Sequence, residues 1–469
     1  MGVQVGSIDW INQTLETLVG YVWGLPLVIL LVGTGLFLSV ALRGIQFRGF
    51  LHGISVVRGK YDNPNDPGEI THFQALCTAL SATVGLGNIA GVAVAIHFGG
   101  PGAVFWMVVT GLVGMATKYS EVSISLMYRK IDPNGVVHGG AMHYIERGLG
   151  PKWKPLAIFF ALACLSASFG AANMFQANQV AAILNNSFSV PHILTGVVLA
   201  FLTGVVIIGG IKRIGKVTSR LVPVMGGIYF LGALVVVVMN WSLVPQVLWQ
   251  IVSDAFTGTA AGGGLTGIAV REVLIQGVRR ACFSNEAGLG TAPIAHAAAT
   301  TSEPVREGTV ALLEPFIDTV VICTLTALVI LISGVWTSGA NGVELTAHAF
   351  DVVLPGFGSY FVPLAVFLFA YSTLISWSYY GQQAVEYLVG EKGVMTYKIA
   401  FCFAAILGAI WAIEPVLNFS DMMLGLMVIP NLIAVLLLLP KLRQETDRYF
   451  AKLKANEFPL APKKDERDL

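Results

Sequence analysis

Charged residues are scarce in this chain of 469 residues. Asp, Glu, Lys and Arg make up 12% of it, whereas apolar residues make up 55%. Because soluble domains carry about 25% charged residues, this composition excludes an ordinary soluble domain. The chain has only five cysteines, placed singly in apolar segments, so we expect neither a disulfide framework nor a cysteine metal site. With a net charge of +1 and no basic stripe, we expect no nucleic-acid partner.

The chain is rich in long apolar runs, and its mean hydropathy is +0.73. Runs of about 20 residues can cross a hydrocarbon core of about 30 Å, so the sequence predicts an all-α polytopic membrane protein with eleven spans. The expected spans are 17–42, 69–98, 102–128, 155–184, 192–211, 217–240, 264–299, 308–335, 359–388, 395–413 and 416–440. Short helices are expected at 46–59, 244–256 and 342–351. The N-terminus shows no signal-peptide pattern, so we expect the first span to be retained.

Basic residues fall on one side of this topology. Of the 28 Lys and Arg residues, four lie deep within predicted spans, namely Lys118, Arg271, Arg279 and Arg280, while Arg220 and Lys398 lie at span ends that border the same loops as the others. The others lie in alternate loops or in the C-terminal segment 441–469. Because Lys and Arg favour the cytoplasmic side of a membrane protein, we expect the N-terminus outside and the C-terminus in the cytoplasm. The expected location is the cell membrane.

An eight-residue pattern occurs twice, as Ser-Ala-Thr-Val-Gly-Leu-Gly-Asn at 81–88 and as Ser-Asn-Glu-Ala-Gly-Leu-Gly-Thr at 284–291. Each glycine weakens a helix by about 1 kcal/mol relative to Ala, and such breaks in corresponding spans of two halves point to a secondary transporter's binding site. The two copies open two opposed sets of five spans. We therefore predict a five-plus-five inverted repeat. Its parts are an extra helix with an interfacial helix (1–60), two repeats (61–240 and 241–440) and a polar cytoplasmic tail without hydrophobic period (441–469).

The first break predicts a pair of binding functions. Amides at the start of the second half-helix attract an anion such as a carboxylate, and carbonyls at the end of the first half-helix suit a hard cation. A zwitterionic amino acid and a sodium ion would use both, and the hydroxyls of Ser372 and Thr373 could complete the sodium site. Two alternatives remain: a glycine-rich packing face, and hydroxyls that bond back to their own helix.

Charged and amide side chains within spans are expensive and indicate functional positions. Glu286 could pair with an arginine and steady the second break, a role that we favour over direct contact with the ligand. Arg279 and Arg280 could line an external vestibule or gate. Lys118 and Glu121 are expected to pair or to reach the membrane surface. Glu314 and Asp318 are equally compatible with a structural and a gating role, and three amides, Asn173, Gln176 and Asn178, need partners inside the bundle.

Several motifs resemble the alanine/glycine:cation symporters. They are Asp66-Pro-Gly-Glu69, His72-Phe-Gln-Ala-Leu76, Ala82-Thr-Val-Gly-Leu-Gly-Asn-Ile-Ala-Gly-Val92, Gly99-Gly-Pro-Gly-Ala-Val-Phe-Trp-Met107, Lys118-Tyr-Ser-Glu121, Phe283-Ser-Asn-Glu-Ala-Gly-Leu-Gly-Thr-Ala-Pro-Ile294, Trp377-Ser-Tyr-Tyr-Gly381 and Ile429-Pro-Asn431. The likeness covers residues 17–440 and implies the leucine-transporter fold with sodium-coupled uptake of small neutral amino acids. Leu86 stands where the family often has Thr, which leaves the exact substrate open.

The resemblance also implies site residues. Leu86 and Gly87 would hold the substrate carboxylate, Gln176 would hydrogen-bond the ligand, and carbonyls near Phe283 and Ser284 would receive the ammonium. The candidate substrate residues are Thr83, Gly85, Leu86, Gly87, Asn88, Gln176, Phe283, Ser284, Asn285, Thr373 and Trp377, of which Phe283, Thr373 and Trp377 would wall the side-chain pocket. The candidate sodium residues are Ser81, Val84, Phe369, Ala370, Ser372 and Thr373.

The expected function is therefore sodium symport of alanine or glycine by alternating access, with sodium as coupling ion and no other cofactor. A related alternative keeps the fold but changes the small amino acid or replaces sodium by protons. A passive channel would favour a continuous polar pore, whereas here the polar residues gather at two breaks. An enzyme is not expected, because paired catalytic carboxylates, metal-ligand spacing and a nucleophile elbow are absent from the sequence.

Overall fold

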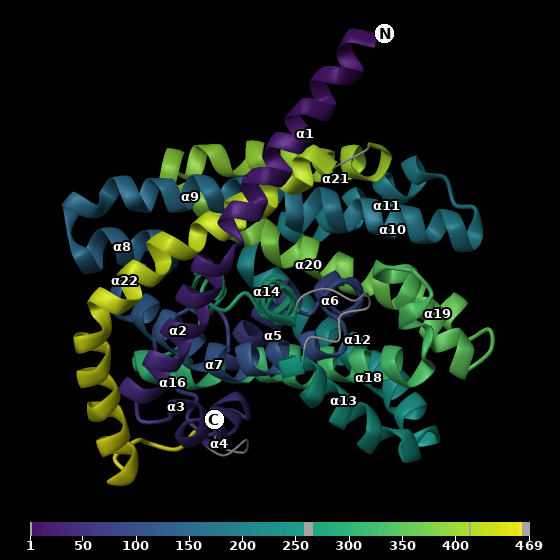
Figure 1. Ribbon diagram of the computed structural model, residues 1–469. Coiled ribbons are helices and arrows are strands. Elements are labelled where there is room, and N and C mark those ends of the chain that lie inside the picture. Colours follow the sequence, from purple (N-terminus) through teal and green to yellow (C-terminus); the bar gives the residue numbers. More distant parts are fainter. Residues whose placement is uncertain (1, 258–265, 412–413, 462–469) are drawn as a thin grey trace.

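The computed structural model describes residues 2–257, 266–411 and 414–461, and these residues are almost entirely helical (Figure 1). The elements of the first part are α1 (Gly2–Val22), α2 (Leu25–Ala41), α3 (Ile45–Arg48), α4 (Phe50–Val57), α5 (His72–Thr83), η1 (Gly87–Gly91), α6 (Val92–Gly99), α7 (Gly102–Tyr128), β1 (Lys130–Ile131), β2 (Val137–His138), α8 (Ala141–Leu149), η2 (Pro151–Trp153), α9 (Lys154–Phe169), η3 (Gly170–Met174), α10 (Phe175–Phe188), α11 (His192–Ile207) and α12 (Gly210–Met239).

The second part is also built of helices. In Figure 1 its long helix α22 crosses the body of the protein and turns down one side of it. Its elements are η4 (Trp241–Leu243), α13 (Val244–Thr257), α14 (Thr266–Asn285), α15 (Ala292–His296), α16 (Pro304–Ala311), α17 (Leu313–Pro315), η5 (Phe316–Cys323), α18 (Thr324–Ser333), η6 (Val335–Thr337), α19 (Gly342–Val353), α20 (Gly358–Val389), η7 (Glu391–Gly393), α21 (Val394–Ile410) and α22 (Glu414–Lys454). The only strands among the described residues, β1 and β2, form an antiparallel pair.

Most predicted spans are helices that can cross a membrane. Eight helical segments are long and apolar enough, and the bent pair α5 and α6 makes a ninth. The other two predicted spans fall short for different reasons. Helix α11 has only 16 residues, and α14 carries the four charged residues Arg271, Glu272, Arg279 and Arg280. Each of the eleven predicted spans contains helix, while the number of membrane crossings stays a prediction.

The first break lies between α5 and η1. Helix α5 begins at a capping box in which Thr71 accepts from the Gln74 N–H, and it ends at Thr83. Its continuation through η1 and α6 is bent by 52°. The break falls at Gly85, as predicted from the glycine pair. A Cβ on the second glycine, Gly87, would lie 3.0 Å from the Ser284 Cα, so the two breaks pack directly against each other.

The second break is longer. Helix α14 ends at Asn285 and α15 begins only at Ala292. Glu286, Gly288 and Gly290 have φ angles of 56°, 91° and 78°, a left-handed region that side chains with a Cβ rarely occupy. The chain therefore crosses the interior as a turn rather than as a helix, with the Leu289 N–H donating to the Glu286 carbonyl at 3.1 Å. The two glycines remove the steric cost at two of the three left-handed positions.

Peripheral elements confirm the predicted short helices and show how the polar tail starts. Short helices α3 and α4, α13 and α19 cover the segments predicted as short helices. The expected polar tail begins as helix, because α22 continues unbroken to Lys454. Tyr449 on this extension is fully buried, and the Ala461 N–H donates to the Lys60 carbonyl at 2.9 Å. Residues 462–469 lie outside the described part. The division into two repeats stays a prediction.

Candidate functional site

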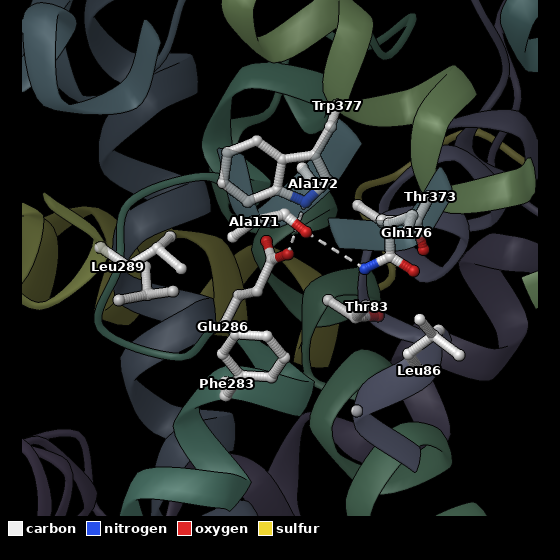
Figure 2. Close-up of a pocket in the computed structure, with 14 residues that line it drawn as sticks. Thr83, Leu86, Ala171, Ala172, Gln176, Phe283, Glu286, Leu289, Thr373 and Trp377 are labelled. Atoms are coloured by element: carbon white, nitrogen blue, oxygen red, sulfur yellow. Dashed lines mark hydrogen bonds between the residues drawn. The ribbon is translucent and has the colours of Figure 1, made fainter. Parts of the chain in front are cut away.

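A small cavity lies where the two breaks meet α20, η3 and α10 (Figure 2). The space open to the centre of a water molecule is about 30 Å³, which exceeds the 10–15 Å³ or so that a single water needs. The lining residues are Ala82, Thr83, Gly85, Leu86, Gly87, Ala171, Ala172, Gln176, Phe283, Glu286, Leu289, Thr373, Trp377 and Leu424. The cavity is thus built from segments that lie far apart in the sequence.

Eight of the eleven candidate substrate residues line this cavity, namely Thr83, Gly85, Leu86, Gly87, Gln176, Phe283, Thr373 and Trp377. Asn88, Ser284 and Asn285 are buried beside it and do not line it. Five lining residues were not predicted from the sequence, namely Ala82, Ala171, Ala172, Leu289 and Leu424, and Glu286 was predicted as a gating or structural charge. Ala82 and Leu289 belong to the two copies of the eight-residue pattern, which could have indicated them. Ala171, Ala172 and Leu424 carry no comparable sequence signal.

The three amides of the fourth predicted span have different partners. The Asn173 Nδ2 donates to the Phe401 carbonyl at 2.7 Å, and the Asn178 Nδ2 donates to the Gly408 carbonyl at 3.1 Å. Both therefore tie this span to α21. Gln176 faces the cavity instead: its Nε2 donates to the Ala171 carbonyl at 3.3 Å, while its Oε1 is buried without a hydrogen-bond partner among the described residues. Such an unpaired acceptor indicates a ligand donor.

Glu286 fixes the aromatic wall of the cavity. Its carboxylate accepts from the Trp377 Nε1–H at 2.9 Å and from the Thr291 hydroxyl at 2.5 Å, and Figure 2 shows the indole and the carboxylate meeting beside Ala171. The predicted pairing of Glu286 with an arginine is wrong within the described residues. Arg279 instead pairs with Asp421 of α22 at 3.4 Å, because its side chain extends toward α22 and away from the break.

Arg280 is the second arginine that we expect at a vestibule or gate. Its Nε lacks a hydrogen-bond partner within the part of the chain that the structure describes, and its side chain does not line the cavity. The gate role of both arginines stays a prediction.

Asp318 joins the two breaks. Its Oδ1 accepts from the Asn88 Nδ2 at 2.7 Å and from the Ser284 hydroxyl at 3.1 Å, and its Oδ2 accepts from the Thr319 hydroxyl at 2.7 Å. Asn88 in turn accepts from the Gly85 N–H at 2.8 Å. One buried carboxylate therefore holds a side chain from each break. This is why Asn88 and Ser284 lie behind the cavity wall.

The neighbouring residue Asn285 has a similar supporting role. Its Nδ2 donates to the Thr319 hydroxyl at 2.9 Å, and its Oδ1 accepts from the Ala287 N–H at 2.9 Å. Asn285 thus connects the start of the second break to η5. This contact supports the non-helical backbone that follows, since the side chain supplies a hydrogen bond that the helix no longer provides.

Oxygen atoms of the first break and of α20 converge beside the cavity. The Ser81 hydroxyl donates to the Ser372 carbonyl at 2.7 Å, and the Ser372 hydroxyl lies 3.2 Å from the Ser81 carbonyl. The hydroxyls of Ser372 and Thr373 also reach the Phe369 carbonyl, at 2.8 and 3.0 Å, so the predicted alternative of bonding back to the own helix occurs here. Hydroxyl and carbonyl oxygens are the ligands that hard cations prefer.

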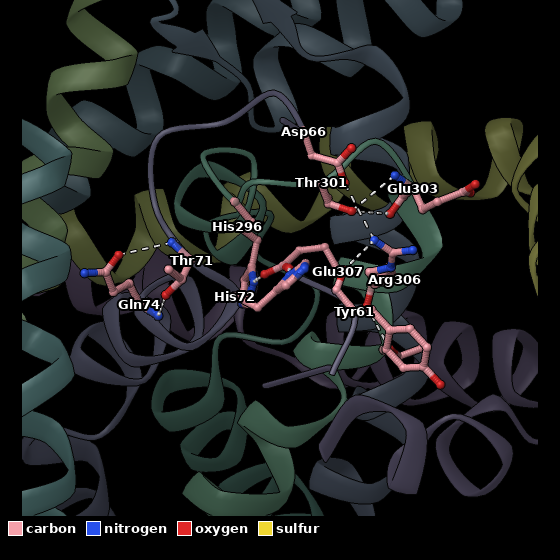
Figure 3. Close-up of polar contacts among 12 residues, drawn as sticks. Tyr61, Asp66, Thr71, His72, Gln74, His296, Thr301, Glu303, Arg306 and Glu307 are labelled. Carbon is pink, nitrogen blue, oxygen red and sulfur yellow. Dashed lines mark hydrogen bonds and ion pairs between the residues drawn. The ribbon is translucent and has the colours of Figure 1, made fainter. Parts of the chain in front are cut away.

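Polar contacts close the end of the bundle where the basic loops lie (Figure 3). Glu307 of α16 contacts the Nδ1 of His72 and accepts from the Nδ1 of His296 at 2.6 Å; all three side chains are buried. Lys118 pairs with Glu314 at 3.4 Å. The predicted pair of Lys118 with Glu121 is therefore wrong among the described contacts, because Glu121 accepts from Asn431 of α22.

Arg129, which follows α7, connects the start of the first broken span with the end of the second. It donates to the carbonyls of Ala297 and Ala299 at 2.6 and 2.7 Å and to the Pro67 carbonyl at 2.9 Å. Pro67 precedes α5, and the two alanines follow α15. Outward movement of either segment at this end would therefore break contacts with Arg129.

The family model described as the sodium:alanine symporter family matches residues 8–463 of the chain. The chain belongs to this family. It is 43% identical over 449 residues to the sodium/alanine symporter AgcS of Methanococcus maripaludis, covering 94% of this chain and 98% of the relative. It is also 36% identical over 456 residues to the probable sodium/glutamine symporter GlnT of Bacillus subtilis, covering 96% of this chain and 94% of the relative.

A solved structure supports the predicted fold. MhsT in complex with L-phenylalanine superposes with a TM-score of 0.55 at 13% identity, covering 77% of this chain and 89% of that chain. The fold of this family member is thus that of the leucine-transporter class. Together with the family, it identifies a multi-pass membrane protein that transports amino acids with sodium and is not an enzyme.

Proposed function

We propose that this symporter carries a small neutral amino acid, alanine or glycine, into the cell together with sodium by alternating access. The N-terminus lies outside and the C-terminus in the cytoplasm. The observation that supports the proposal most is the small cavity between the two breaks. It contains an unpaired buried acceptor, the Oε1 of Gln176. It is also lined by the N-terminal end of one half-helix and the C-terminal end of another.

The two charged ends of an amino acid find complementary groups there. The amides of Leu86 and Gly87 lie at the start of the second half-helix, where backbone N–H groups lack intrahelical acceptors, and they would receive the carboxylate. The carbonyls of Phe283 and Ser284 lie in the last turn of α14, where carbonyls lack intrahelical donors. These carbonyls and the Gln176 Oε1 would receive the ammonium group.

The cavity walls favour a small side chain. Leu86, Phe283, Thr373 and Trp377 all line a space of about 30 Å³, and the hydrogen bond between Trp377 and Glu286 holds the indole in place. A larger substrate would need these side chains to move. Close packing makes such movement costly, so the geometry supports alanine or glycine over large apolar amino acids.

The sodium ion would lie between the first break and α20. Carbonyls of Ser81, Val84, Phe369 and Ala370 and the hydroxyls of Ser372 and Thr373 would coordinate it, in place of the present contacts between Ser81 and Ser372. Thr373 also lines the cavity. Sodium bound there would order the break that holds the substrate carboxylate, and by linkage the substrate would raise the affinity for sodium equally.

The test is uptake into proteoliposomes. The purified chain should accumulate labelled alanine or glycine against its gradient when sodium is directed inward, and accumulation should collapse when the sodium gradient is dissipated with an ionophore. Accumulation that ignores the sodium gradient would sink the coupling. Equilibration without accumulation would instead support a passive channel. Competition by a panel of small amino acids would identify the preferred substrate.

A second candidate keeps this mechanism but lets protons replace or accompany sodium. The buried trio of His72, Glu307 and His296 favours it, since two histidines that contact one carboxylate can take up or release a proton near the closed end of the bundle. A pH-sensitive dye inside the liposomes distinguishes the two. Alanine-dependent acidification without sodium would establish proton coupling, and sodium-dependent uptake without acidification would exclude it.

A further inference from the structure

A second cavity, separate from the substrate site, lies between α4, α5, α12 and η5. Its space open to the centre of a water molecule is about 450 Å³, against about 30 Å³ for the substrate cavity. Nearly all of its lining side chains are apolar, and Arg58 is the only charged one. A cavity of this size and character does not fit a zwitterionic amino acid, because nothing in its apolar body would pair with two charges.

One wall of this apolar groove is a single face of α5. Phe73, Leu76, Leu80 and Val84 line it and recur at intervals of three or four residues, which places them on one side of the helix. Val84 lies at the buried end of the groove, next to the first break, and is 2% exposed. Phe73 is near the other end and is 39% exposed. The groove therefore runs from the surface of the bundle toward the break.

The opposite wall on α12 is left open by two adjacent glycines. A Cβ at Gly226 or Gly227 would meet no atom within 4 Å, although both residues line the groove. Their neighbours Val224, Ile228 and Leu231 are exposed by 57%, 39% and 60%. Since α12 is a candidate membrane span, its exposed apolar side chains face lipid, and the groove beside them opens to the acyl region of the bilayer.

Two exposed arginines lie on the helices that form the groove. Arg58 caps α4 and lines the groove; its side chain is exposed and forms no hydrogen bond or ion pair with any described residue. Arg220 lies one turn before Pro223, another lining residue, on the same face of α12. It too is exposed. We place both on the cytoplasmic side.

We propose that this groove binds one acyl chain of an anionic phospholipid of the cytoplasmic leaflet, with the lipid phosphate held by Arg58 and Arg220. Basic pockets between membrane-spanning helices on the cytoplasmic side suit anionic headgroups, and guanidinium groups bind phosphate oxygens through paired N–H donors. The apolar body of the groove takes the chain. The leaflet rests on the proposed orientation of the symporter, whereas lipid binding itself does not depend on which amino acid is carried.

The test measures lipid retention by the full chain and not transport. The protein is equilibrated in detergent with equal amounts of phosphatidylglycerol and phosphatidylcholine, and bound lipid is counted by native mass spectrometry. Wild type should retain one phosphatidylglycerol in preference to phosphatidylcholine. Arg58→Ala with Arg220→Ala should lower this retention about tenfold or more, and Gly227→Leu, which fills open space, should lower retention of both lipids.

Matched controls separate the groove from the rest of the surface. Gly33→Leu also adds a side chain at an exposed glycine with no atom within 4 Å, and Lys152→Ala with Lys392→Ala removes two exposed cytoplasm-side charges. Both control variants should retain lipid as wild type does. Equal phosphatidylglycerol retention by Gly227→Leu and Gly33→Leu would overturn the site. Retention without preference for phosphatidylglycerol would overturn the phosphate contact. A failure of amino-acid uptake would change neither result.

Discussion

Replacing Gln176 by Leu should weaken substrate binding without weakening the fold. The Oε1 of Gln176 has no hydrogen-bond partner among the described residues, and an unsatisfied buried acceptor costs about 1–3 kcal/mol. The Leu variant removes this cost but also loses the Nε2 contact with the Ala171 carbonyl at 3.3 Å, which contributes about 0.5–1.5 kcal/mol. The two changes roughly offset, so the ligand-free melting temperature should stay close to that of wild type.

The substrate-bound protein should behave differently. A hydrogen bond to a charged group such as an ammonium contributes about 1.5–3 kcal/mol, which corresponds to a roughly 10- to 150-fold rise in Kd on its loss. At an alanine concentration of about 100 Kd, binding stabilises the folded protein by about 2.7 kcal/mol. After a 30-fold weakening the same concentration is about 3 Kd, and the stabilisation falls to about 0.8 kcal/mol.

The assay is a thermal melt in detergent with sodium, with and without alanine. Gln179→Leu is the matched control, because Gln179 lies on the same helix, α10, and does not line the cavity. It should keep the full alanine-induced shift, whereas Gln176→Leu should lose most of it. If Gln176→Leu keeps the shift, Gln176 does not bind the ammonium, and the orientation proposed for the substrate is refuted.

Three further perturbations follow from other contacts. Gly85→Ala should abolish uptake, because its Cβ would lie 2.6 Å from the Thr373 Oγ1. Gly91→Ala, whose Cβ would meet no atom within 4 Å, should retain uptake. Equal uptake by both variants would contradict the close approach of Gly85 to Thr373. Asp318→Asn should lower both the melting temperature and uptake, since a buried acceptor of hydrogen bonds from both breaks becomes partly a donor; unchanged values would show that the breaks do not depend on it. Burial and two nearby cations lower the pKa of His52 from 6.5 to about 4, so the folded state binds fewer protons than the unfolded state, and stability should fall as pH drops from about 6.5 through about 4. The melting temperature of His52→Gln should fall less over this range, and an identical pH profile would contradict the assignment.

The breaks could be located from sequence because their signal is local. A glycine pair within an apolar run weakens the helix at the position where it stands, and both breaks fall at the predicted patterns: the first at Gly85 and the second from Glu286 to Thr291. The lining residues near the breaks followed for the same reason. Ala171 and Leu424 could not be found in this way, since a small or apolar residue in a span looks alike whether it faces a cavity or another helix.

Partners of buried charges could not be read from the sequence. The spacing favours an arginine on its own helix as the partner of Glu286, yet this carboxylate accepts from Trp377, 91 residues away. Lys118 likewise pairs with Glu314, although Glu121 is one turn distant. In both cases the helix packing brings a remote group to the inner face, and burial makes any unpaired charge costly. Sequence spacing identifies which charges need partners, while only the packed structure identifies the partners.

The two breaks, although they share a pattern, do not do the same thing. The first resumes helix almost at once after a bend of 52°, so it offers amides and carbonyls within a short distance. The second leaves the chain non-helical from Glu286 to Thr291 and presents a carboxylate that orients Trp377. Asp318 bonds to a side chain from each. A rearrangement that opens either break must therefore move both or give up a buried hydrogen bond. If substrate and sodium bind at the breaks as proposed, this shared carboxylate would give both of them a physical route to affect the same conformational step.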